Sequence, residues 1–191
     1  MKILPLVPLV FVATLSGQAV AGLVVDGDLA DWKIDKTTWV SSLPGVHATT
    51  EDSTGGSNIR LDPGYGGQAY DAEALYTTFQ GGKLFIALVT GHNPLTGNNP
   101  NASVFSAGDF AIDFGKDGSY DLGINIVNNF AGGVLGGVYR DPVWAYGLWD
   151  ADGGEVKKTK KPVDKAHPTS LLNGTLMGMA VSAYTTNGVG G

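Results

Sequence analysis

The 191-residue sequence lacks cysteine, and only 16% of its residues are charged. Without disulfides, a folded domain must depend on its hydrophobic core for stability. There is also no thiol nucleophile, and the three histidines, at positions 47, 92 and 167, stand in no catalytic motif. Carboxylate pairs occur, but none has a recognisable glycosidase setting. We therefore expect a protein without enzymatic activity.

Basic residues are scarce as well. The chain has 12 Lys and Arg against 18 Asp and Glu, a formal net charge of −6. Five of the lysines fall within 157–165, a segment that reads either as a solvated loop or as a contact to an acidic partner. The remainder is acidic, which disfavours nucleic acid as a partner and suits divalent cations or neutral polymers better.

No apolar run is long enough to span a bilayer, which takes roughly 20 residues. The longest, at 3–15, follows Lys2 and contains two prolines. It leads into Ala19-Val20-Ala21, a small-residue pattern typical of signal-peptide cleavage. We expect residues 1–21 to be an export signal, with a retained N-terminal anchor as the alternative. The domain at 22–191 is then secreted or held at the cell surface, without membrane insertion after cleavage.

Glycine is abundant instead, at 29 residues, and gathers in turn clusters between short apolar segments. A hairpin is predicted over 72–79 and 83–90, and its second strand is apolar on both faces, as in a central strand. Residues 109–114 and 121–127 alternate apolar and polar side chains, as half-buried strands do. A short apolar strand is predicted at 23–25, weaker strand patterns lie at 132–139 and 143–148, and one or two further strands are predicted over 171–184.

These short strands and the lack of an amphipathic helix pattern predict an all-β fold. We expect an antiparallel β-sandwich of jelly-roll or immunoglobulin-like type, with long loops at 41–69 and 92–106. A closed barrel is the alternative. About 170 residues after the signal suit a single domain.

Three segments carry a family resemblance: 25–32 (Val-Asp-Gly-Asp-Leu-Ala-Asp-Trp), 70–91 and 106–124. They resemble the carbohydrate-binding module family 9-like, or DOMON-like, sandwiches of exported proteins. The resemblance implies an extracellular module, often followed by a sorting helix or a dockerin. This sequence ends at Gly191, where the family would continue into further strands. We expect the sheet to be completed either by residues beyond this sequence or by a strand from another chain.

The strongest chemical pattern is the acidic segment 113–121. Calcium takes six to eight oxygen ligands, often from a loop bent around a glycine such as Gly118. Oxygen-bearing residues match positions one, five, seven and nine of such a loop: Asp113, Asp117, Ser119 and Asp121. Gly115 and Ile124 stand where acids are expected at positions three and twelve. The pattern predicts a weak calcium site, and the alternative is a hairpin loop with turn-forming Asp and Gly.

A second group of carboxylates falls on predicted strands. Asp71 and Glu73 share one face of a strand, and Asp109 begins another. Carboxylates brought together repel one another, and a bound metal ion would relieve that repulsion. The alternative is that these side chains simply face solvent. By contrast, Asp26, Asp28 and Asp31 are expected to build the entry turn, with Trp32 as a structural residue.

Three aromatic residues lie within six positions and beside several aspartates: Trp144, Tyr146 and Trp149. An exposed ring can stack on a pyranose face while polar neighbours bond its hydroxyls. The cluster predicts a glycan-binding surface. The alternative is a strand whose aromatic side chains enter the core.

We therefore expect an exported, non-catalytic protein with one of two functions. The first is a calcium-assisted module that binds glycans at the cell surface. The second is a structural subunit of an extracellular filament or matrix, a homo-oligomer assembled by β-strand complementation. A secreted polysaccharide hydrolase is a less favoured third.

Overall fold

The computed structural model describes residues 22–50, 72–91, 108–126, 130–147, 160–163, 165–166 and 168–181. This part of the chain forms strands and no helix. It therefore contains no helix that is long and apolar enough to cross a membrane. The strands form three antiparallel sheets. The expected all-β, sandwich-like fold is confirmed.

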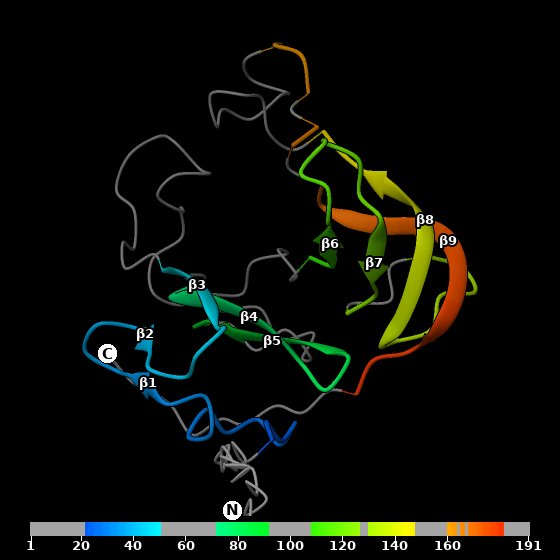
Figure 1. Cartoon of the computed structure of the whole chain (residues 1–191). Helices are drawn as coiled ribbons and strands as arrows, with labels where there is room; N and C mark the ends of the chain where they lie inside the picture. Colours follow the sequence, from blue (N-terminus) through cyan, green and yellow to red (C-terminus); the bar gives the residue numbers. More distant parts are fainter. Residues whose placement is uncertain are drawn as a thin grey trace, which may run out of the picture.

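The first two sheets come from the N-terminal half of the chain (Figure 1). A two-stranded ribbon pairs β1 (Ile34–Asp35) with β2 (Val40–Ser41). A three-stranded sheet has the order β3-β4-β5, with the bounds His47–Thr50, Ala74–Gln80 and Lys83–Val89. The predicted hairpin is therefore present, since β4 and β5 pair from Ala74↔Val89 to Gln80↔Lys83.

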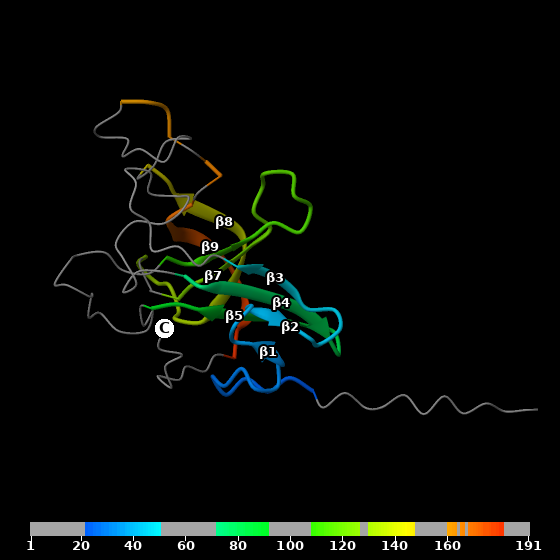
Figure 2. The ribbon, with the colours of Figure 1, turned by 90° about the vertical axis from the view of Figure 1, so that its left-hand side faces the viewer.

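The third sheet has the order β6-β7-β8-β9. Its bounds are Phe110–Ile112, Leu122–Ile124, Gly137–Ala145 and Ser170–Met179. Figures 1 and 2 show the three-stranded sheet lying between this sheet and the N-terminal segment that carries β1 and β2. The pairing of β8 with β9 contains register shifts, and both strands curve strongly (Figure 1).

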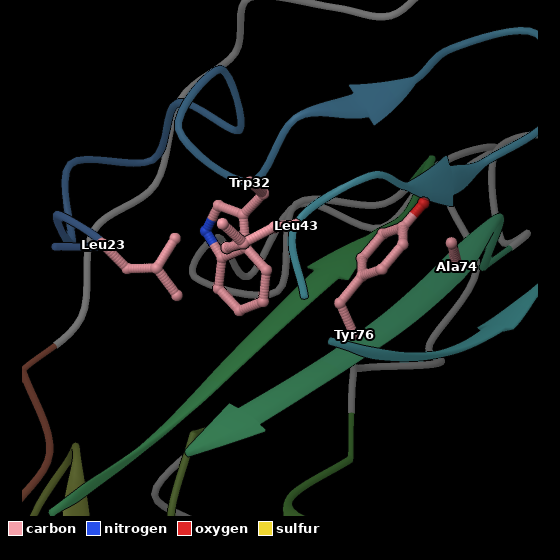
Figure 3. Packing of buried hydrophobic residues seen from close by; sticks show 5 residues of the cluster. All are labelled: Leu23, Trp32, Leu43, Ala74 and Tyr76. Carbon is pink, nitrogen blue, oxygen red and sulfur yellow. The ribbon is translucent and has the colours of Figure 1, made fainter. Parts of the chain in front are cut away.

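One hydrophobic core lies between the N-terminal segment and the three-stranded sheet (Figure 3). Its buried members are Leu23, Trp32, Leu43, Ala74 and Tyr76. The rings of Trp32 and Tyr76 lie 6.3 Å apart, and the Tyr76 hydroxyl donates a 2.7 Å hydrogen bond to the Trp39 carbonyl. Burial raises the pKa of Tyr76 above its ordinary value. The structural role expected for Trp32 is confirmed.

The segment before β1 is a turn built by aspartates. Asp26 Oδ1 accepts the Asp28 amide at 2.9 Å, and Asp28 Oδ1 accepts the Ala30 amide at 3.0 Å. Asp31 Oδ2 accepts the Val24 amide at 2.6 Å. These are the local bonds that make aspartate a turn former. The turn expected here is present, but the strand predicted at 23–25 is not, because the segment instead packs Leu23 onto the core.

A second core lies within the four-stranded sheet and comprises Tyr139, Trp144 and Leu171. Gly123 of β7 lies beneath it. A Cβ atom there would stand 2.8 Å from Leu171 Cδ1 and 3.1 Å from Trp144 Cζ2, which is too close for any larger residue without repacking. The glycine therefore lets the curved β8–β9 pair fold over β7.

Three strand predictions need correction. β5 stands at an edge of the described sheet and pairs there with β4 alone, although a central strand was expected. One of its faces packs on the first core through Phe85, Ala87 and Val89, whereas Leu88 on the other face is exposed. β8 is one strand through Asp141-Pro142, not two, because bulges absorb the irregular residues. β2 ends within the predicted long loop, and β3 lies inside it.

Candidate functional site

The segment 113–121 connects β6 to β7 and is held by its own carboxylates. Asp113 accepts the Gly118 amide through Oδ2 at 2.9 Å and the Asp117 amide through Oδ1 at 3.4 Å. Asp117 Oδ1 accepts the Ser119 amide at 2.8 Å, and Asp121 Oδ2 accepts the Phe114 amide at 2.7 Å. Gly118 takes a φ of 86°, which favours glycine at the bend. The turn-forming alternative accounts for these bonds.

The charge of Asp113 is stabilised within this loop. Desolvation is the largest single effect and raises the pKa of Asp113, but hydrogen bonds from the backbone amides of residues 115–118 together outweigh it and hold that pKa below its ordinary value. In the part of the chain that the structure describes, no group of three or more His, Cys, Asp or Glu is arranged to hold a metal ion. Calcium binding by Asp113, Asp117, Ser119 and Asp121 stays a prediction.

The second group of carboxylates is divided between two sheets. Asp109 precedes β6, and its Oδ1 and Oδ2 accept the amides of Ile126 at 2.6 Å and Leu171 at 2.8 Å. Glu73 is half-buried just before β4, in the other sheet. Asp71 lies outside the described residues. Asp109 therefore acts as a clamp between the end of β7 and the start of β9, a role that its sequence position did not reveal.

The aromatic cluster lies mostly in the core. Trp144 is only 7% exposed, and Tyr120 meets its ring edge-on at a centroid distance of 5.8 Å. Its indole Nε1 is buried with no hydrogen-bond partner among the described residues. Tyr146 is half-buried against the same core, and Trp149 lies outside the described residues. A buried ring offers no face to a sugar, so Trp144 fits the core alternative.

The most unusual surface of the described chain is the outer edge of β9. This strand ends the four-stranded sheet and, among the described strands, pairs only with β8. Five apolar residues on or just after it are exposed: Leu172, Leu176, Met177, Met179 and Val181. The register with β8 shifts between Val138 and Tyr139 and leaves Met177 without a register partner. The C-terminal half of β9 therefore carries exposed apolar side chains along an irregular stretch of the strand.

The sequence of β9 contained a signal for this surface. Ser170–Met179 has no charged residue and no proline, which are two of the features with which natural proteins protect a free strand edge. Recognising it required knowing that β9 is an edge strand, which depends on the pairing of distant segments.

A second apolar contact at the surface was not predicted from the sequence. The exposed rings of Phe79, in β4, and Phe114, in the loop between β6 and β7, lie 6.4 Å apart.

Comparison of the chain with protein-family models, with curated proteins and with solved structures found no match in any of the three. The resemblance to carbohydrate-binding sandwiches therefore stays a prediction from three sequence segments.

Proposed function

We propose that this chain is an exported, non-catalytic structural subunit that joins a second copy of itself through the edge of β9. The observation that carries the proposal is this ten-residue strand, which has a free edge among the described strands and several exposed apolar side chains. A free edge presents unpaired backbone N–H and C=O groups, and an added strand satisfies them while it buries the side chains.

The sequence of β9 favours a specific contact between its edge and a partner strand. An exposed edge without charge or proline promotes aggregation unless a partner covers it. Because β9 itself is uncharged, a neighbouring strand can approach it without bringing the acidic charges of two copies together.

A second copy is the partner that the chain itself supplies. β5 is also an edge strand of the described sheets, and its seven residues carry a single charge, at Lys83. The other edge strands of the two larger described sheets, β3 and β6, have four and three residues, so they offer much shorter ladders. Strand pairing depends mainly on backbone hydrogen bonds, so β5 or β9 of a neighbour fits this edge.

The glycan-binding alternative has less support from the described residues. Its proposed platform needs exposed rings, whereas Trp144 is a core residue and Tyr146 packs against the same core. We therefore favour assembly as the function.

The proposal is tested by sedimentation of the chain 22–191 over a wide range of protein concentration. We expect the mass of the species to increase with concentration. Met177→Lys, at a site that is 62% exposed, introduces a charge on β9 and should restore the monomer. Val40→Lys, at a site of 58% exposure on β2, is the matched control and should assemble like the wild type. A wild-type chain that stays monomeric at every concentration would overturn the proposal.

A further inference from the structure

The backbone of β9 is irregular at one exposed asparagine. Asn173 pairs with Val143 and Thr175 pairs with Arg140, whereas Gly174 between them has no register partner on β8. The Gly174 amide instead donates a 2.8 Å hydrogen bond to Oδ1 of the Asn173 side chain. A backbone nitrogen therefore lies directly beside the side-chain amide of the preceding residue.

From this arrangement we infer that Asn173 is a site of spontaneous deamidation. The Gly174 nitrogen, after losing its proton, attacks the side-chain carbonyl carbon of Asn173. A nitrogen–carbon bond forms, the bond to the side-chain nitrogen breaks, and ammonia leaves, which produces a five-membered succinimide. Water then opens either carbonyl of this ring and leaves aspartate or isoaspartate. The sum of the two steps exchanges one ammonia for one water and needs no oxidant or other reagent.

Three features favour the reaction at this position. The hydrogen bond keeps the Gly174 nitrogen beside the side-chain amide that it attacks. Asn173 is exposed, so water can reach the ring. Gly174 has no side chain to hinder closure, and a Cβ atom there would stand 2.8 Å from Tyr139 Cβ and 3.2 Å from the Arg140 carbonyl oxygen. The fold therefore requires the glycine that makes its neighbour reactive.

Asn125 provides a contrast within the same chain. It is completely buried, and its Nδ2 donates to the Val134 carbonyl at 3.1 Å. The following amide, of Ile126, is bound to Asp109 Oδ1 at 2.6 Å. Both the target and the attacking group are occupied there, so Asn125 should be stable.

The modification would change the edge of the sheet. Aspartate introduces a negative charge between Leu172 and Leu176, and isoaspartate also adds a methylene to the backbone. A charge on an edge strand opposes the addition of another strand, so deamidation should weaken self-assembly. This consequence rests on the proposed function, whereas the deamidation does not.

The test is a time course on the purified chain 22–191 at neutral and alkaline pH, with peptide mapping by mass spectrometry and an isoaspartate assay. A short peptide spanning residues 171–176 gives the reference rate. We expect Asn173 to convert at about the peptide rate or faster, to yield isoaspartate, and to react faster at alkaline pH because the attacking nitrogen must lose its proton. Asn125 should remain intact.

Asn173→Gln is the matched variant, because it keeps the amide but cannot form the five-membered ring. It should remove the signal at this position and leave any signal from the second Asn-Gly pair, at 187–188, unchanged. An Asn173 that stays intact over several half-lives of the peptide would overturn the inference. If Asn173 deamidates but the chain never assembles, only the proposed function is overturned. If the chain assembles but Asn173 stays intact, only this inference is overturned.

Discussion

Asp109 and Leu171, 62 positions apart, are joined by a 2.8 Å hydrogen bond from the Leu171 amide to Asp109 Oδ2. The other carboxylate oxygen accepts the Ile126 amide at 2.6 Å. One side chain therefore fixes the start of β9 against the end of β7, which positions the strand whose outer edge we propose as the interface. The contact is structural, and metal binding by Asp109 stays a prediction.

Asp109→Ala should destabilise the fold. It leaves two partly buried amide donors without an acceptor, and each unsatisfied donor costs about 1 to 3 kcal/mol. We expect a loss of at least about 2 kcal/mol in the free energy of unfolding, measured by urea denaturation. Asp109→Asn keeps one acceptor oxygen and should lose less. An alanine variant as stable as the wild type would show that the clamp contributes nothing.

Trp144→Ala tests whether this residue belongs to the core or to a sugar-binding surface. Removing a buried tryptophan leaves a cavity, and we expect a loss of about 3 to 5 kcal/mol in stability. Trp144→Phe should retain part of the packing and lose less. Unchanged stability together with reduced binding on a glycan array would contradict the core assignment and favour the glycan-binding function.

Asp113 should make stability depend on pH under acidic conditions. Its folded pKa lies below the ordinary value because loop amides bind the carboxylate. The resulting stabilisation is fully present above the unfolded pKa of about 3.9 and is lost as the pH falls through the lower, folded pKa. Titration of the Asp113 carboxyl carbon by NMR measures the shift, and Asp113→Asn should flatten this part of the stability profile. A midpoint at or above the ordinary value would contradict the assignment.

The calcium hypothesis for residues 113–121 makes a separate prediction. A site with a dissociation constant of about 0.1 mM should stabilise the chain by about 2.7 kcal/mol at 10 mM calcium, roughly a hundredfold excess over that constant. Thermal unfolding with calcium and with a chelator measures this difference. Asp117→Asn should reduce it, whereas Asp35→Asn, outside the loop, should not. Identical melting curves of the wild type with calcium and with the chelator would show that the loop does not bind calcium.

Local patterns predicted the β4–β5 hairpin and the strands β6 and β7, but not the hairpin of β1 and β2. The pair β4–β5 follows from two apolar segments around a glycine turn, and β6 and β7 follow from clean alternation. Edge positions were not predictable in this way, because they depend on which distant strands meet. β5 is apolar on both faces, yet it lies at an edge of the described sheet.

The same limit applied to the candidate sites. The burial of Trp144 depends partly on the space left by Gly123, on another strand. The partners of Asp109 are 17 and 62 positions away. The residue types pointed to carboxylate and aromatic chemistry, but whether those groups face solvent or the fold was decided by long-range packing.

Hydrogen exchange along β9 tests the proposed assembly most directly. The chain 22–191 is compared at a low and a high protein concentration, with peptides that cover 170–179 and 137–145. We predict that the amides of β9 exchange more slowly at high concentration, that those of β8 change little, and that Met177→Lys abolishes the difference. Equal exchange of β9 at both concentrations, in a sample that sedimentation shows to be assembled, would contradict the claim that copies join through this edge.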